Sequence, residues 1–405
     1  MISGEREEGR ATIACALSGA LSVLPVFLIG SLAVFMRTDL GFSEAGVGGA
    51  VSVYFGSFAL LSTLGGRLSE RLGPRRSMLV AGAASCAALL GTAVVARSFL
   101  DVLIFQAVAG AGNALAQPAG NLTLARAIRP SRLGLAFGVK QAAIPSATLF
   151  AGVTIPLLAV TLSWRWSFAV ASLVAGPLVW SMYPGIARRP FHLKAESLPF
   201  PQPRRANTDF VPDLRNTPQA SNPMLLLLAT AFWLGSASTI TLGTFTVESA
   251  AHYGWTPTAA GLLLAAASVV AIATQLASGR LADFIGGNSL ALVGSLLVLG
   301  SAGFVLIGLG HASAVMVVGV VIAFGAGWGW NGLLSLAIVL LSRASPAAAT
   351  GIVMTGAGLG GLTGPVTFGV LITRTGYPTA WLTSAVAAMC AGLLVLFASR
   401  RMAAR

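Results

Sequence analysis

Twelve apolar segments, each long enough to cross a bilayer as a helix, account for nearly all of this 405-residue chain. A helix needs about 20 residues to span roughly 30 Å of hydrocarbon. Only 9% of the residues are charged and 56% are hydrophobic, whereas a soluble domain is about a quarter charged. The sequence therefore predicts an all-α integral membrane protein with spans at 12–36, 43–64, 77–96, 99–125, 135–160, 166–184, 223–247, 257–278, 289–309, 314–341, 348–372 and 380–398.

The basic residues predict how the chain is oriented in the lipid bilayer. With both termini in the cytoplasm, 20 of the 25 Lys and Arg residues fall on the cytoplasmic side and four on the other side, and Lys140 lies inside a span. Such an excess is typical of cytoplasmic loops. Because the net charge of +13 comes from these short loops, no nucleic-acid partner is expected. We expect a multi-pass protein of the inner or plasma membrane, and the preference for Arg over Lys is a sign of a GC-rich bacterial genome.

The two halves of the chain repeat each other. Residues 185–222 are polar and rich in Pro and Arg, which predicts a cytoplasmic linker between two six-helix bundles, residues 1–184 and 223–405. The motifs at Gly66 and Gly279 are 213 residues apart, and those at Gly110 and Gly325 are 215 apart. A nearly constant offset between separate motifs indicates a parallel duplication of six spans.

The loop after the second span reads Gly-Arg-Leu-Ser-Glu-Arg-Leu-Gly-Pro-Arg-Arg over residues 66–76. It resembles the signature G-x-x-x-[DE]-[RK]-x-G-x-[RK]-[RK] of the major facilitator superfamily, and every defined position is filled, by Gly66, Glu70, Arg71, Gly73, Arg75 and Arg76. The resemblance covers the whole chain. It implies two pseudo-symmetric six-helix bundles, transport of a small-molecule substrate by alternating access, and a monomer. It also implies that this loop is a conformational latch between the halves.

The chain departs from the family's patterns at several positions. In the second copy of the loop Asp283 remains, but Phe284, Gly287 and Asn288 replace the basic residues, so the resemblance implies an asymmetric latch. Gln106 stands where proton-coupled members often carry an arginine. Pro145 is followed by Ser-Ala-Thr in place of the paired glycines that are typical of drug/proton antiporters.

The fourth span carries amides on one helical face. Gln106, Asn113, Gln117 and Asn121 are spaced by 7, 4 and 4 residues. We call these four residues the amide stripe. Polar amides in lipid are costly unless they face protein or water. The stripe therefore predicts either a face toward a central cavity, where the amides can bond a polar solute, or amide packing between helices.

Lys140 is a cation within the fifth span, and Gln141 follows it. In sugar porters of the superfamily a substrate-binding glutamine has the same spacing after a loop arginine, here Arg132, so the resemblance places Lys140 near the binding cavity. A buried ammonium needs a counter-charge, and no carboxylate lies in the middle of any predicted span. One interpretation is an anionic substrate such as a carboxylate. The other is that Lys140 extends to cytoplasmic headgroups.

The remaining substrate-binding candidates are Trp328, Asn331 and Tyr54. Trp328 is the repeat mate of Asn113, so we expect it to form an apolar wall or gate of the cavity, or else to be core. Phe55 and Trp233 are further aromatic candidates. Glu248 and His252 flank the outer end of the seventh span, where we expect a solvated loop mouth; titration during coupling is the alternative.

Three functions fit this sequence. The first is a secondary transporter of a small organic anion, with a proton or ion as a possible coupling partner. The second is a proton-coupled multidrug or toxin exporter, and the third is a membrane sensor that binds solute without transport. No constellation of nucleophile and base predicts an enzyme. Since the sequence lacks a phosphate-binding loop and a metal-binding motif, we expect no cofactor and no metal.

Overall fold

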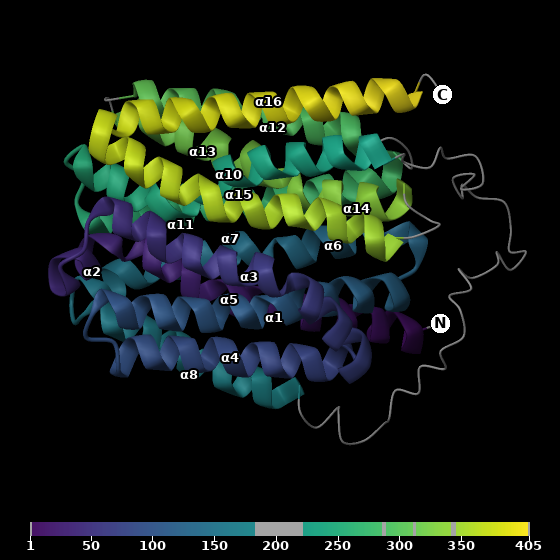
Figure 1. The fold of residues 1–405 in the computed structure, drawn as a ribbon, viewed down its shortest axis with the longest axis horizontal. Coiled ribbons are helices and arrows are strands. Elements are labelled where there is room, and N and C mark those ends of the chain that lie inside the picture. The colour runs from purple at the N-terminus through teal and green to yellow at the C-terminus, as the bar shows by residue number, and fades with distance from the viewer. Residues whose placement is uncertain (1, 183–221, 286–288, 311–312, 342–345, 404–405) are drawn as a thin grey trace, which may run out of the picture.

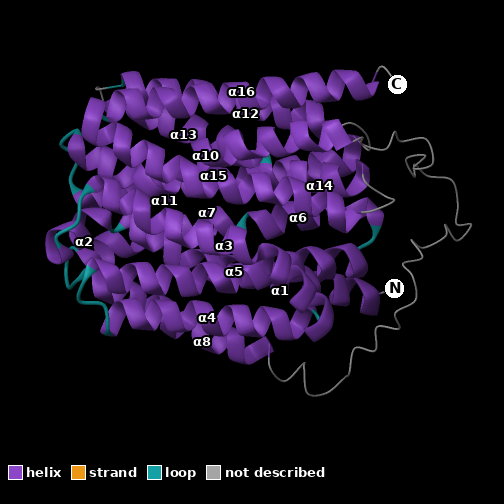
Figure 2. Cartoon of the chain, viewed as in Figure 1, coloured by secondary structure: helices purple, strands orange, loops and turns teal. Residues whose placement is uncertain are grey.

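The computed structural model of the protein describes residues 2–182, 222–285, 289–310, 313–341 and 346–403. These residues form helices joined by short turns, and no β-strand occurs among them (Figure 2). The first half contains α1 (Ile2–Ser31), α2 (Ala33–Leu40), α3 (Glu44–Leu72), α4 (Pro74–Val94), α5 (Phe99–Ala127), η1 (Pro130–Arg132), α6 (Leu133–Gln141), α7 (Ala143–Thr154), η2 (Ile155–Ala159) and α8 (Trp164–Met182). The second half contains α10 (Asn222–His252), α11 (Pro257–Ile285), α12 (Ser289–Leu309), α13 (Ser313–Gly329), α14 (Asn331–Leu341), α15 (Pro346–Thr375) and α16 (Tyr377–Ala403).

The helical segments have the dimensions that a bilayer requires. Among the described residues, eleven segments are long and apolar enough to cross a membrane, and α8 occupies the place of the sixth predicted span. Large apolar side chains such as Leu60 and Leu173 point outward, and Leu60 is 84% exposed. In water such a surface would be unfavourable, whereas in a bilayer it meets acyl chains. The predicted all-α transmembrane fold is confirmed.

The helices of the two halves lie along opposite sides of the molecule. Figure 1 shows the first half, purple to blue, below the second half, green to yellow. The halves meet where α3 packs on α15, where α6 and α7 pack on α11, and where α1 packs on α10. The predicted linker lies outside the described residues except for Asn222, so the domain boundaries stay a prediction.

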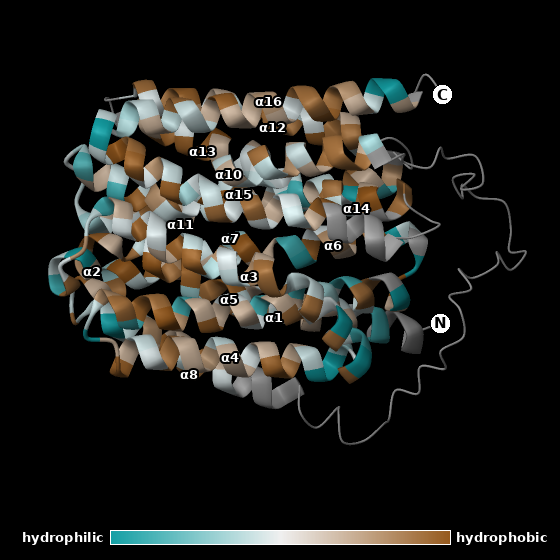
Figure 3. Ribbon diagram, viewed as in Figure 1, coloured by the Kyte–Doolittle hydropathy of each residue, from teal (hydrophilic) through white to brown (hydrophobic). Residues whose placement is uncertain are grey.

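Both ends of the bundle can be identified from the chain termini. The start of α1 and the end of α16 lie at the same end of the molecule (Figure 1). We call it the terminal end, and the other the opposite end. Hydrophilic residues gather toward the two ends, and apolar residues dominate between them (Figure 3). This distribution is the one expected of a protein with polar surfaces on both sides of a membrane.

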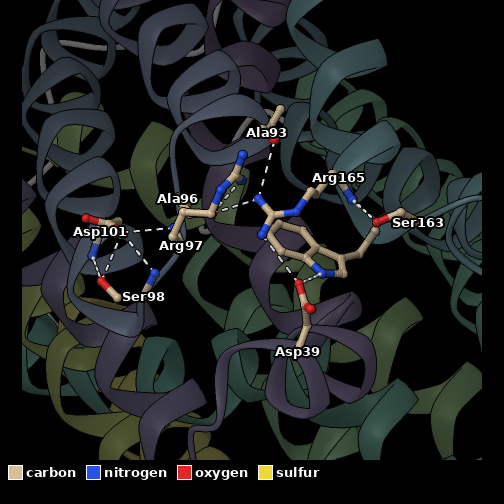
Figure 4. A network of polar contacts seen from close by, with 9 residues as sticks. Asp39, Ala93, Ala96, Arg97, Ser98, Asp101, Ser163 and Arg165 are labelled. Atoms are coloured by element: carbon tan, nitrogen blue, oxygen red, sulfur yellow. Dashed lines mark hydrogen bonds and ion pairs between the residues drawn. The ribbon is translucent and has the colours of Figure 1, made fainter.

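Short polar motifs hold the loops of the first half at the opposite end. Helix α5 begins with a capping box, in which the Ser98 hydroxyl accepts from the backbone N–H of Asp101 and the Asp101 carboxylate accepts from that of Ser98. Asp39, near the end of α2, accepts from the Trp164 indole at 3.0 Å and lies 3.4 Å from Arg165 (Figure 4). These contacts tie the short helix α2 to α8.

Two of the predicted spans are broken in their middle. The predicted span 135–160 divides into α6, α7 and η2, with a turn at Ala142. Pro145 has no backbone N–H to donate to the Gln141 carbonyl four residues earlier, which accounts for a break there. The predicted span 314–341 divides at Trp330 between α13 and α14, a break that we did not predict. Breaks at membrane depth are tolerated where the backbone is buried in protein or lines a cavity.

Close packing between the halves depends on a small residue at position 48. A Cβ atom added to Gly48 of α3 would lie 2.3 Å from the Pro365 carbonyl oxygen of α15, whereas one added to the neighbouring Gly49 meets nothing within 4 Å. The close approach of α3 and α15 therefore requires glycine at position 48 and not at position 49.

We expect Gly48→Ala to lower the thermal unfolding temperature of the detergent-purified protein, because the added methyl group overpacks the contact at a cost of about 1–3 kcal/mol. Gly49→Ala is the matched control in the same helix, and it should leave the unfolding temperature unchanged or raise it, since alanine favours helix over glycine. Equal unfolding temperatures for the two variants would contradict the proposed close contact.

Candidate functional site

Lys140 lies at the end of α6, and its side chain points at α5. It is 4% exposed. Its ammonium donates to the Gln117 side-chain oxygen at 2.8 Å and to the Asn121 side-chain oxygen at 2.6 Å. Gly120 allows the close approach, because a Cβ there would lie 3.0 Å from Lys140 Cε. The structure thus brings together Lys140 and two members of the amide stripe.

The hydrogen bonds continue from Lys140 into the first half. The Gln117 amide nitrogen donates to the Asn113 side-chain oxygen at 3.3 Å, and the Ser22 hydroxyl donates to the same oxygen at 2.9 Å. The Tyr54 hydroxyl donates to the Ser22 carbonyl at 2.6 Å. Three predicted residues, Tyr54, Asn113 and Gln117, therefore belong to one network that ends at Lys140.

The described partners of the Lys140 ammonium are neutral. Within the described part of the chain, no ion pair joins Lys140 to a carboxylate. Its two amide partners carry only partial negative charge, and they account for two of its three N–H donors. A buried ammonium with neutral partners keeps an uncompensated charge, which makes Lys140 the candidate position for an anionic group.

Gln141 points in a different direction from Lys140 and bridges the halves. Its amide nitrogen donates to the side-chain oxygen of Asn331 at 3.0 Å, so the two helix breaks meet across the interface.

Gln275 of α11 was not among the predicted residues. It donates to the Trp328 carbonyl at 2.6 Å, and its own side-chain oxygen is buried with no hydrogen-bond partner among the described residues. The sequence signal for it was an amide in an otherwise apolar span.

The indole of Trp328 packs against apolar residues of both halves. Trp328 donates its indole N–H to the Thr239 carbonyl at 2.9 Å, and its ring lies 5.9 Å from the ring of Phe27 in the first half. It thus packs at the interface between the halves. Trp330 is fully buried against Phe232 within the second half.

Two of the aromatic and amide candidates lie apart from the Lys140 network. Gln106 donates to the Pro25 carbonyl at 3.3 Å, and none of its described hydrogen bonds reaches Lys140. Trp233 lines a cavity of about 190 Å³ between α10, α15 and α16 with Thr363 and Thr383. None of the other predicted substrate-binding residues lines that cavity, and Trp233 is 39% exposed.

A carboxylate closes the terminal end between the two halves. Asp283 of α11 accepts from the backbone N–H groups of Gly134 at 2.7 Å and Leu135 at 2.9 Å, in the first turn of α6. Arg132, which precedes α6, makes no side-chain cap. Asp283 therefore supplies from the second half the cap that α6 lacks in its own sequence. Gly134 is small enough for this approach, since a Cβ there would lie 2.6 Å from the carboxylate.

The predicted latch loop of the first half lies on the surface at the turn between α3 and α4. Gly73 has φ +82°, which glycine tolerates, and Pro74 begins α4. The charged side chains of the loop, Glu70, Arg71, Arg75 and Arg76, are exposed, and Gly66 is half-buried. Its latch role stays a prediction, whereas the eroded copy at Asp283 makes the contact between halves described above.

Comparisons with known proteins agree with this architecture. A sequence profile described as "Major Facilitator Superfamily" matches residues 15–329 and 227–404. The chain belongs to the major facilitator superfamily, whose members are membrane transporters.

Two individual relatives extend the comparison. The chain is 24% identical over 166 residues to the "Hexuronate transporter" of Bacillus subtilis (strain 168). That match covers 41% of this chain and 39% of the relative's length. In fold it is similar to the crystal structure of the human organic anion transporter MFSD10 (TETRAN), with a TM-score of 0.65, 17% identity, and coverage of 96% of this chain and 99% of that chain.

We expect Asp283→Ala to open the terminal end more often, because two backbone N–H groups lose their acceptor. A lost helix cap costs about 1 kcal/mol, or roughly fivefold in population. Cys15 reports the opening, since it is buried in one apolar cluster with Phe137 and Leu336, which come from the two halves. With Cys86 and Cys390 replaced by serine, a water-soluble maleimide should label Cys15 several-fold faster in Asp283→Ala than in the parent protein.

Two further variants calibrate this labelling rate. Asp283→Asn keeps one acceptor oxygen and should label at an intermediate rate. Asp39→Ala removes a carboxylate at the opposite end, bonded only within the first half, and should label at the parent rate. Labelling of Asp283→Ala at the parent rate would show that the contact does not hold this end closed.

Proposed function

We propose that the chain is a secondary active transporter that moves small organic anions, with a carboxylate group bound at Lys140. The observation that carries the proposal is the buried ammonium of Lys140, whose described partners are the neutral amides of Gln117 and Asn121. A carboxylate is the complementary group for such a cation, and charge-assisted hydrogen bonds are the strong ones.

The comparisons support the same substrate class. One relative is named a hexuronate transporter and one neighbour in fold an organic anion transporter, and both names denote carriers of anions. A hexuronate carries one carboxylate and several hydroxyl groups. The amides near the helix breaks, Gln141, Asn331 and Gln275, can donate to and accept from hydroxyl groups. An anion of this type would meet Lys140 with its carboxylate and the amides with its hydroxyls.

The proposed mechanism is alternating access between the two halves. Asp283 bonds the first half at the terminal end, and Arg37 of α2 pairs with Glu248 of α10 at the opposite end, so a polar contact joins the halves at each end of the described conformation. The bond between Gln141 and Asn331 joins the halves between these closures. Substrate that bonds both amides would take the place of this direct bond, and binding would thereby be coupled to the relative position of the halves.

We further propose that the terminal end faces the cytoplasm of a bacterial cell and that the protein acts as a monomer in the inner membrane. The support is the excess of 20 basic residues over four between the two predicted sides. A gradient of protons or ions would drive symport or antiport, since the sequence has no phosphate-binding loop for ATP.

We expect small carboxylates, tested first as glucuronate and galacturonate, to raise the thermal unfolding temperature of the detergent-purified protein. A ligand at 100 times its dissociation constant stabilises the folded state by about 2.7 kcal/mol. Lys140→Met keeps the apolar stem, removes the charge, and should abolish the shift. Arg400→Ala removes one exposed positive charge from the last turn of α16 and should retain it.

The same panel distinguishes the alternatives. Glucose, which lacks the carboxylate, should give a much smaller shift than glucuronate. If apolar drugs or cations stabilise the parent and Lys140→Met equally, the anion proposal is wrong and an exporter is favoured. If carboxylates bind but are not exchanged by the protein in liposomes, the chain is a sensor that kept the transporter fold.

A further inference from the structure

Glu248, in the last turns of α10, is a buried carboxylate at the opposite end of the bundle. Its side chain is 3% exposed, which corrects the expectation of a solvated loop mouth at this position. One of its oxygens, Oε1, pairs with the Arg37 guanidinium of the first half. The other oxygen, Oε2, is buried and has no hydrogen-bond partner among the described residues. An ionised carboxylate with one unsatisfied oxygen is costly at this depth.

Arg37 has a second carboxylate partner on its own half. The guanidinium nitrogen that contacts Glu248 also lies 3.3 Å from an oxygen of Glu44, at the start of α3. Arg37 is 29% exposed and Glu44 is 24% exposed, so the cluster borders the aqueous side and protons can reach it. With both carboxylates ionised, the three groups carry one net negative charge.

Other ionisable groups near this cluster are few. The Tyr377 hydroxyl of α16 lies 3.5 Å from Glu44, and the His252 ring stacks on the Tyr377 ring at 4.6 Å. Tyr253 follows α10, and Arg374 near the end of α15 is exposed. Asp39 of α2 bonds Trp164 and Arg165 of α8 instead of this cluster. Three further segments packed on α10 contain no carboxylate, imidazole or basic residue: 11–31 of α1, 257–279 of α11 and 313–329 of α13.

The cluster divides unequally when the halves separate at this end. Arg37 and Glu44 both belong to the first half and leave together as a neutral pair. Glu248 stays with the second half as an unpaired anion in the outer part of a span. A proton on Oε2 removes that charge without breaking any described hydrogen bond, because this atom has no partner. Separation is therefore favourable for the protonated carboxyl and unfavourable for the carboxylate.

We propose that Glu248 is a proton-binding site and that its protonation opens the opposite end of the transporter to the aqueous side. The proton adds to Oε2, the charge of the side chain changes from −1 to 0, and the ion pair with Arg37 is lost. Re-closure against Arg37 favours release of the proton. This proposal goes beyond the proposed substrate, because it names an ion that controls access independently of what Lys140 binds.

The sign of the pH dependence follows from this cycle. The closed end binds one proton fewer than the open end, so acidification favours opening. For a single proton the ratio of open to closed molecules changes by up to about tenfold per pH unit within the responsive range.

A pair of labels across the opposite end tests the proposal without any substrate. Thr38 of α2 and Thr379 of α16 are exposed, one on each half. With Cys15, Cys86 and Cys390 replaced by serine, spin labels are attached at Thr38→Cys and Thr379→Cys. The distance distribution is then measured in lipid nanodiscs between pH 8 and pH 5. We expect a longer distance to gain population as the pH falls.

Matched variants assign the response to one residue. Glu248→Gln mimics the protonated group and should show the longer distance at every pH. Glu44→Gln and His252→Gln remove neighbouring titratable groups and should retain the pH response. If Glu248→Gln does not fold, Arg37→Gln serves instead, and it should abolish the pH-dependent opening, because the closed end no longer holds the carboxylate ionised beside a cation.

Two results would overturn the proposal: a distance distribution that does not change with pH, or a pH response in Glu248→Gln equal to that of the parent. The outcome is independent of the anion proposal, since no substrate is present. Glu248→Gln should also keep the carboxylate-induced rise in unfolding temperature that Lys140→Met loses. Loss of that rise in every protein, with the pH response intact, would reject the anion substrate alone.

Discussion

Hydrocarbon offers no hydrogen-bond partner, so a polar group within the spans of this chain is stabilised only by partners inside the protein. The network from Tyr54 to Lys140 is the result: each amide of α5 that belongs to it bonds another buried polar group rather than lipid. The same constraint applies at the helix breaks at Ala142 and Trp330, which lie where the halves meet. At the second break, Gln275 and Ser278 of α11 donate to the carbonyls of Trp328 and Gly329.

The two ends of the bundle are closed by different chemistry. At each end a carboxylate of the second half bonds a donor of the first half, Asp283 at the terminal end and Glu248 at the opposite end. Asp283 faces two neutral backbone N–H groups at a helix start, whereas Glu248 faces a guanidinium that it shares with Glu44. The first contact weakens when its geometry is lost, and the second also weakens when a proton neutralises the carboxylate. The closures can therefore respond to different signals.

The fold could be predicted almost entirely from the sequence because its signals are local. Span length depends on consecutive residues, and each basic loop and each copy of a duplicated motif can be recognised within a short stretch of the chain. The helical face of the amide stripe was likewise readable from spacing, and Asn113, Gln117 and Asn121 do share a network. Spacing alone did not predict the partner of Gln106, which has the spacing of the amide stripe but donates to the Pro25 carbonyl.

What the sequence could not supply was the pairing of helices distant in the chain. The burial of Glu248 depends on Arg37, 211 positions earlier. The hydrogen bond from Gln275 to the Trp328 carbonyl exists because α11 packs on α13. No proline near Trp330 predicts the helix break there, whereas Pro145 lies next to the break at Ala142. Each of these features is decided by tertiary packing, which residue spacing along one helix does not encode.

Lys140 combines a feature that the sequence predicts with partners that only the structure reveals. Its position in an apolar span predicted a cation in need of a counter-charge, and the structure places that cation against neutral amides of its own half. Those amides orient the ammonium and keep it hydrogen-bonded when no substrate is present, but they leave its charge uncompensated. Lipid headgroups are excluded as partners in this conformation, because the side chain is directed into the protein and is only 4% exposed. The proposed anion would therefore gain its largest electrostatic stabilisation at Lys140, between the contacts that join the halves at the two ends, which agrees with substrate sites near the membrane midplane in transporters that work by alternating access.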